Sequence, residues 1–254
     1  MAGIYPLLIS PSQAADLAIV IDDIGYSLAR SDRVIALPGP LTLGVLPFAP
    51  NAAEAARRAV LAGKEIILHQ PMEPIPAHHV HNVDGTLTLN MGPQRFSRLF
   101  AEAVRAVPNA IGVSNHTGSL LTQHAEPMNL LMEQINARGL FFLDSRTTRK
   151  TVALSVARKW RVPSIQRDVF LDHVANRNAV DYQFQRAIAI ARRNGHAVII
   201  AHPYPVSLEY LEGALRNLPD DLRLIGVSEL VRPRHSIGLA RHGNPESPRI
   251  SLGQ

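Results

Sequence analysis

The chain has 254 residues, of which 46% are hydrophobic and 19% charged, a composition typical of a globular protein. It contains no cysteine, which excludes disulfides, thiolate metal sites and cysteine nucleophiles. The formal charge of +5 is scattered and no apolar run reaches the length of a membrane span, so we expect neither a nucleic-acid partner nor a transmembrane segment.

The two ends of the chain differ from its middle. Residues 1–16 hold a short apolar stretch followed by small residues, like the back half of a secretory signal whose basic front is missing. A signal remnant would place the protein in the periplasm or cell envelope, whereas a short leader without a targeting role would leave it in the cytoplasm. Residues 232–254 lack periodicity and predict a flexible tail, which leaves residues 17–231 as one folded domain.

Between these ends, apolar runs typical of buried strands alternate with amphipathic segments. The predicted strands are Leu17–Ile21, Leu41–Leu46, Glu65–Leu68, Ala110–Val113, Leu140–Leu143, Ser164–Gln166, Ala197–Ala201 and Leu222–Val227. The predicted helices include one opened by a capping box at Asn51 and Glu54, one over 96–107, one over 128–135, one over 184–191, and one opened by Ser207. Strands alternating with helices predict an α/β fold, a single-domain (β/α) barrel of seven or eight mostly parallel strands; an open doubly wound sheet is the alternative.

Six predicted strands are followed within two residues by histidine, aspartate or asparagine. These positions are Asp22-Asp23, His69, Asn115-His116, Asp144-Ser145, Arg167-Asp168 and His202. In a parallel β/α fold all these strand ends meet at one face, where ligands bind. A cap or turn explains each residue singly but gives no reason for three histidines, so we expect a functional site at this face.

These residue types favour hydrolysis with a divalent metal. Asp23, His69 and His116 form a two-histidine, one-carboxylate set of the kind that catalytic metal sites use. Asp22 is then a candidate general base and His202 a candidate general acid, with Asp144 or Asp168 expected to orient the imidazole. A glycosidase using Asp22 with Asp144 or Asp168 is an alternative, but it leaves the histidines unexplained.

Five segments resemble a known family. They read AIVIDDIG (18–25), LHQPMEP (68–74), NHTGS (115–119), FLDSRTT (142–148) and AHPYP (201–205). Over about Leu17–Val231 the chain resembles the divergent polysaccharide deacetylases, relatives of the NodB-type carbohydrate esterases. The resemblance implies a distorted β/α barrel and a divalent metal, usually zinc. It also implies Asp22 as the base, Asp23 as a metal ligand and His202 as the acid.

The chain departs from those esterases at two motifs. Glu73 stands where their His-x-x-x-His motif has its second histidine, which leaves Glu73 and His116 as candidates for the third ligand; we prefer His116. Their Arg-x-Pro motif has no clear match here, and Asn115-His116 occupies that place. The resemblance implies removal of N-acetyl groups from an acetylated polysaccharide or peptidoglycan-like glycan, with Asn115, Ser145, Arg146 and Glu73 as expected substrate contacts. A catalytically degenerate protein that binds metal and glycan is the alternative.

Overall fold

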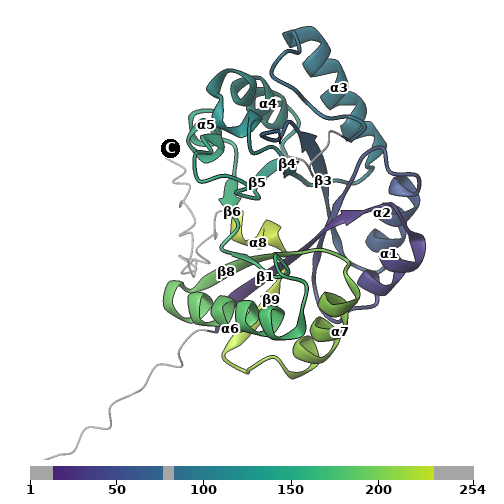
Figure 1. Ribbon diagram of the computed structural model, residues 1–254, viewed down its shortest axis with the longest axis vertical. Coiled ribbons are helices and arrows are strands. Elements are labelled where there is room, and N and C mark those ends of the chain that lie inside the picture. Colours follow the sequence, from purple (N-terminus) through teal and green to yellow (C-terminus); the bar gives the residue numbers. More distant parts are fainter. Residues whose placement is uncertain (1–13, 77–82, 232–254) are drawn as a thin grey trace, which may run out of the picture.

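The computed structural model describes residues 14–76 and 83–231, where strands form one sheet with helices around its outside (Figure 1). The strands are β1 (Ala15–Ile24), β2 (Thr42–Val45), β3 (Glu65–Met72), β4 (Gly112–Thr117), β5 (Phe141–Asp144), β6 (Ser164–Gln166), β7 (Val169–Phe170), β8 (His196–Ala201) and β9 (Leu222–Ile225). The helices are α1 (Leu28–Ile35), α2 (Ala52–Leu61), α3 (Pro93–Ala106), α4 (Ala125–Ala137), α5 (Ala153–Lys159), α6 (Arg177–Asn194), α7 (Pro205–Ala214) and α8 (Val227–Val231), with short 3₁₀ turns η1 (Leu121–Gln123) and η2 (Leu215–Asn217).

The sheet topology is that of a barrel. Eight strands lie in the order β6-β5-β4-β3-β2-β1-β8-β7, β9 pairs with β1, and the strand pairings of the described residues are parallel. Taken as a ring, this is the order along the chain, interrupted between β6 and β7. A doubly wound sheet would instead reverse its order at a switch point. The predicted α/β class and distorted (β/α) barrel are therefore confirmed.

The interruption between β6 and β7 is bridged by the chain itself. The backbone N–H of Arg167 donates to Asp144 O at 3.0 Å, and that of Asp168 donates to Val198 O at 2.9 Å. One residue thus bonds to β5 and the next to β8. The eight predicted strands overlap β1–β6, β8 and β9, but β7 was missed because two residues are too short to stand out as an apolar run.

Side chains of each strand alternate between two apolar cores. In β1, Leu17, Ile19 and Ile21 pack with the surrounding helices, whereas Ala18 and Val20 belong to a second cluster inside the barrel. Both sets are fully buried, which explains why the strand reads as one continuous apolar run. The interior cluster also takes residues of β3, β5 and β8, so the two cores together fix which residues face the barrel interior.

The predicted helices are present, but two predicted caps are wrong. Asn51 precedes α2 without capping it, since its side-chain amide donates to Tyr26 O and the side chain of Glu54 pairs with arginines of the helix. Ser207 does not open α7; it lies buried inside that helix, which starts at Pro205. Gly195 ends α6 with φ 82°, a left-handed conformation that glycine adopts at little cost.

The first and last elements of the described residues are β1 and α8. β1 begins at Ala15, so Ala15 and Asp16, which we assigned to the 1–16 leader, belong to the first strand. The rest of the leader to residue 13 and the predicted tail over 232–254 lie outside the described residues. Among residues 14–76 and 83–231, no helix combines the length and apolar character needed to cross a membrane.

Candidate active site

The alternation of β1 brings its polar end to the mouth of the barrel. Asp22 continues the interior face of Ala18 and Val20, and His69 likewise continues the interior face of Ile67 in β3. His202 comes directly after β8 and two residues after Ile200, so it continues the same interior face. Because all three strands run parallel, these polar side chains meet at one end of the barrel, as predicted.

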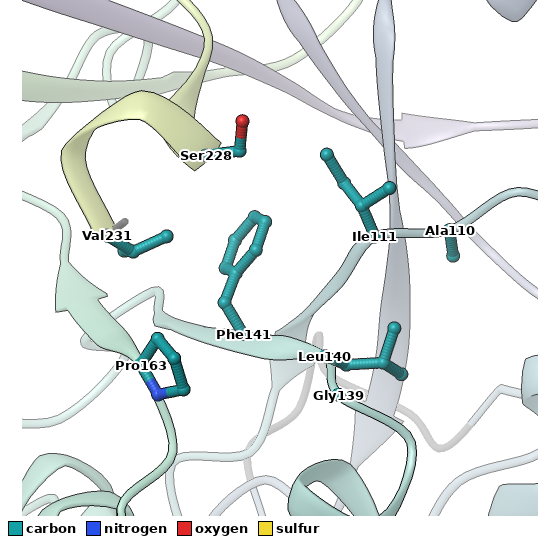
Figure 2. A pocket seen from close by; sticks show the side chains of 8 residues that line it. All are labelled: Ala110, Ile111, Gly139, Leu140, Phe141, Pro163, Ser228 and Val231. Atoms are coloured by element: carbon teal, nitrogen blue, oxygen red, sulfur yellow. The ribbon is translucent and has the colours of Figure 1, made fainter. Parts of the chain in front are cut away.

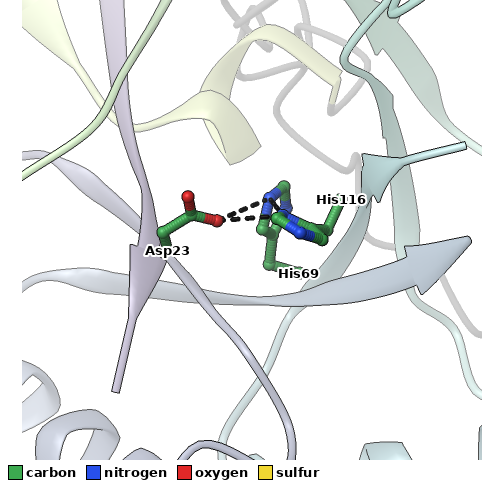
Figure 3. Close-up of side chains that lie close together, drawn as sticks. All are labelled: Asp23, His69 and His116. Atoms are coloured by element: carbon green, nitrogen blue, oxygen red, sulfur yellow. Dashed lines mark hydrogen bonds and ion pairs between the residues drawn. The ribbon is translucent and has the colours of Figure 1, made fainter. Parts of the chain in front are cut away.

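The three predicted metal ligands lie together (Figure 3). His116 Nδ1 is 2.9 Å from Asp23 Oδ1 and 3.2 Å from His69 Nε2, and His69 Nε2 is 3.5 Å from Asp23 Oδ1. The closeness of the donor atoms of Asp23, His69 and His116 makes them a possible metal site, whose ion the structure does not identify. They come from β1, β3 and β4; β3 and β4 pair directly, whereas β2 lies between β3 and β1.

The donor set fits a small divalent cation. With ligand bonds of about 2.0–2.1 Å, neighbouring donors of a tetrahedral zinc site lie about 3.3 Å apart, close to the spacing seen here. Asp23 Oδ1 is buried and accepts no hydrogen bond of good geometry, as expected of a carboxylate oxygen that faces a cation. Ser114 Oγ lies 2.7 Å from the other ring nitrogen of His69, a contact that would keep Nε2 free as a ligand.

Asp23 reaches this position through an unusual backbone. Its φ of 58° lies in the left-handed region, which costs a non-glycine residue free energy and breaks the alternation of the strand. The side chain therefore turns toward the mouth beside Asp22 rather than toward the outer helices. Burial by itself would raise the pKa of Asp23, but the imidazoles of His116 and His69 outweigh burial and hold that pKa far below its usual value.

Asp22 is buried beside this cluster. Its Oδ1 is buried without a hydrogen-bond partner and is 3.5 Å from His69 Nδ1. Burial raises the pKa of Asp22, against the lowering effect of His69 and His202. Gly44 of β2 leaves the space that this carboxylate occupies, since a Cβ there would overlap Asp22 Oδ1.

His202 is held by an aspartate that the sequence reasoning missed. Asp172 Oδ1 lies 2.9 Å from His202 Nδ1, while Asp172 Oδ2 accepts from the backbone N–H of His202 at 2.6 Å and from Ser207 Oγ at 2.8 Å. Phe170 and Tyr204 stack on the imidazole. Burial lowers the pKa of His202, but the carboxylates of Asp172, Asp23 and Asp22 together outweigh it and the net shift is upward. His202 Nε2 points toward the cluster, 3.8 Å from Asp23 Oδ2.

The expectation that Asp144 or Asp168 orients His202 is therefore wrong. Asp144 follows Phe142 on the outer face of β5 and accepts from Arg146 N and Thr151 Oγ1. Asp168 precedes β7, at the opposite end from the site, and accepts from Val198 N. Asp172 lies two residues after Phe170, so both side chains point to the interior face. The sequence signal that could have found Asp172 is the apolar run Val169–Leu171 directly before it.

The four predicted substrate contacts differ in burial and in hydrogen-bond partners. Glu73 is not close to the cluster atoms, since its Oε2 accepts from Leu89 N at 2.7 Å, so the structure favours His116 as the third donor. Asn115 is buried, with its amide oxygen accepting from Ser145 N and its amide nitrogen donating to Thr117 O, which gives it a supporting role. Ser145 has a buried Oγ without a partner, and Arg146 is half-buried. Substrate contact by these residues stays a prediction.

A hollow at the other end of the barrel, near the amino ends of β4, β5 and β6, is lined mostly by apolar residues (Figure 2). Its volume is about 330 Å³, and no ionisable side chain lines it; the lining residues are Ala110, Ile111, Gly139, Leu140, Phe141, Pro163, Ser228 and Val231. Helix α8 covers this end, where Val227 N donates to Thr42 Oγ1 and Ser228 Oγ donates to Glu65. Among the described residues, the cluster of Asp23, His69 and His116 therefore lies at the mouth formed by the carboxyl ends of the strands and not in this hollow.

Comparison with known proteins finds matches that cover most of the chain. The family model described as "Divergent polysaccharide deacetylase" matches residues 19–231. The uncharacterized protein YibQ of Escherichia coli K12 is 38% identical over 224 residues, covering 88% of this chain and 70% of YibQ. The crystal structure of an uncharacterized protein from Agrobacterium tumefaciens C58 is 25% identical, with a TM-score of 0.83 over 87% of this chain and 91% of that one. The peptidoglycan deacetylase PdaC of Bacillus subtilis shares the fold, with 12% identity and a TM-score of 0.53 over 87% of this chain and 92% of that one.

Proposed function

The chain belongs to the divergent polysaccharide deacetylase family, and from this premise we propose that it is a metal-dependent hydrolase that removes N-acetyl groups from a cell-envelope glycan. The observation that carries the proposal is the convergence of Asp23, His69 and His116 at the barrel mouth, with Asp22 and His202 beside them. The proposed location is the periplasm or cell envelope, where an acetylated polysaccharide or peptidoglycan-like substrate occurs.

The cation would be held by Asp23 Oδ1, His69 Nε2 and His116 Nδ1, and two imidazoles with one carboxylate favour zinc. When bound, zinc supplies Lewis acidity, both toward a substrate carbonyl and toward water, whose pKa it lowers from about 15.7 to about 7. Three protein donors leave further coordination positions open, as catalytic rather than structural sites do.

The proton transfers fall to Asp22 and His202. Water adds its oxygen to the acetyl carbon and gives a proton to Asp22, whose raised pKa makes it a stronger base than an exposed aspartate. The carbon–nitrogen bond then breaks, and His202 Nε2 gives a proton to the leaving amine. Acetate and a free amino sugar result, and the proton held by Asp22 returns the site to its starting charge when passed to His202 or to solvent. Asp172 keeps His202 protonated and oriented for this step.

The test is acetate release from an N-acetylated chito-oligosaccharide by the purified protein with Zn²⁺. Asp22→Asn and His202→Asn should each lower the rate about 10²–10⁴-fold, because each removes one proton-transfer group. Asp168→Asn is the matched control, since the Asp168 carboxylate accepts from Val198 N within β8 and not from a group at the mouth. Unchanged acetate release by Asp22→Asn would contradict the mechanism. Zinc and glycan binding without any acetate release would instead support the degenerate binding protein.

A further inference from the structure

Two hollows share one aromatic residue, and the first of them adjoins the candidate metal ligand Asp23. The first, of about 150 Å³, is lined by Asp23, Ser27, Arg30 and Tyr204 among others. The second, of about 200 Å³, is lined by residues 46–50 with Val83 and Asp84. Tyr26 lines both hollows, so the two lie side by side along a path that leads away from Asp23.

Large aromatic rings are exposed along this path. Tyr26 is 56% exposed, Tyr204 41% and Phe48 38%. An aromatic ring in water forgoes much of the free energy that burial would provide, so several of them gathered at one rim indicate a surface that a ligand covers. Their continuity with Asp23 points to the same ligand as the candidate metal site.

Hydrogen bonds and packing contacts hold the walls of the path. Asn51 ties its two walls together, because its backbone N–H donates to Gly25 O at 2.9 Å and its side-chain amide donates to Tyr26 O at 3.3 Å. Phe48 rests on Gly85, where a Cβ would overlap the ring. Tyr204 stacks on His202 with a centroid distance of 5.4 Å. The rings of Phe48 and Tyr204 therefore have packing partners before any ligand arrives, and the backbone that carries Tyr26 is held by hydrogen bonds.

We infer that these hollows form a groove for consecutive sugars of an extended glycan chain, with Tyr26 and Phe48 stacking on sugar rings beyond the one that reacts; the identity of this ligand rests on the proposed function. A pyranose ring presents weakly positive C–H groups on its faces and hydroxyls around its edge. The negative face of an aromatic ring attracts such C–H groups. The side chains of Ser27, Arg30 and Asp84 supply donors and acceptors for hydroxyls along the same path.

The groove predicts that affinity increases with the length of the glycan. It also predicts that the Tyr26 ring contacts short and long glycans, whereas the Phe48 ring contacts only long ones. In calorimetry on the full chain, with metal removed to prevent turnover, Tyr26→Ala should weaken binding of both two-sugar and five-sugar N-acetylated chito-oligosaccharides about three- to tenfold. Phe48→Ala should weaken only the five-sugar ligand by a similar factor. Phe48→Tyr should restore that affinity, because it restores the ring.

The control is Tyr182→Ala, which removes a ring of 67% exposure from α6, outside both hollows. Equal five-sugar affinity for the wild type, Tyr26→Ala and Phe48→Ala would overturn the groove. Acetate release by a protein whose binding ignores these rings would leave the hydrolase standing and the groove refuted. Ring-dependent binding without acetate release would leave the groove standing and refute the hydrolase. Phe48→Leu, which keeps bulk but removes the aromatic face, serves if Phe48→Ala fails to fold.

Discussion

The pairing of Asp172 with His202 allows the sharpest prediction. Asp172→Asn keeps the size of the side chain but removes its charge. In the wild type, Oδ2 accepts two hydrogen bonds, from His202 N and Ser207 Oγ, and Oδ1 faces His202 Nδ1. The asparagine oxygen satisfies both donors only when it replaces Oδ2. Its NH₂ group then faces His202 Nδ1, which can accept that hydrogen bond only in the neutral imidazole.

The magnitude follows from this exchange. A hydrogen bond between charged groups contributes about 1.5–3 kcal/mol, and the variant loses the one between Asp172 and protonated His202. In the wild type the carboxylate raises the pKa of His202, so its stabilising contribution is fully present below the histidine pKa of the unfolded chain, about 6.5, and is lost as pH rises through the folded pKa. The variant should therefore lose about 1.5–3 kcal/mol of unfolding free energy near pH 6 and less at pH 9.

Two assays check this reasoning. Urea unfolding of metal-free protein at pH 6 and pH 9 gives the difference in unfolding free energy, and NMR titration of the His202 ring gives its pKa, which should fall in Asp172→Asn because burial then dominates. Asp168→Asn is the matched control, since that carboxylate bonds Val198 N instead. An unchanged His202 titration in Asp172→Asn would refute the assignment of Asp172 as the residue that positions the acid.

Three further predictions concern the same site. Ser114→Ala should weaken zinc binding about 10–100-fold, measured by competition with a chelating dye, because it removes the partner of His69 Nδ1; a wild-type affinity would show that this contact does not orient the ring. Gly44→Ala should lower acetate release far more than zinc affinity, since the added Cβ displaces the Asp22 carboxylate, and equal losses of both would contradict a role confined to Asp22. The rate of acetate release should fall on the alkaline side only above about pH 6.5, the ordinary histidine pKa, because the pKa of His202 is raised; a fall below that pH would contradict His202 as the acid.

Much of the architecture could be predicted from local patterns. Continuous apolar runs such as Leu17–Ile21 identify strands buried on both faces, and helical spacing in segments such as 96–107 identifies the covering helices. Polar residues at the ends of these runs identified Asp22, Asp23, His69, His116 and His202. These patterns predict the strands correctly because a strand that is buried on both faces needs apolar residues at successive positions, and such a run is visible in the sequence.

The partner of His202 could not be chosen in the same way. Asp144, Asp168 and Asp172 all lie near strand ends, and the difference between them is the face and the end of the strand to which each belongs. Strand β7 spans two residues, so the short run Val169–Leu171 is a weak signal of its alternation, and the interior position of Asp172 was overlooked. Ser207 was misread for a similar reason, because a buried serine inside a helix and a serine at its start look alike in sequence.

The sequence by itself determined that parallel strands carry carboxylates and imidazoles to one end of the protein, because hydrophobic burial and strand polarity act locally along the chain. The tertiary structure alone decided which atoms meet there. The left-handed turn at Asp23, the space left by Gly44 and the contact of Asp172 with His202 depend on the register and curl of strands distant in the chain, which no local pattern encodes.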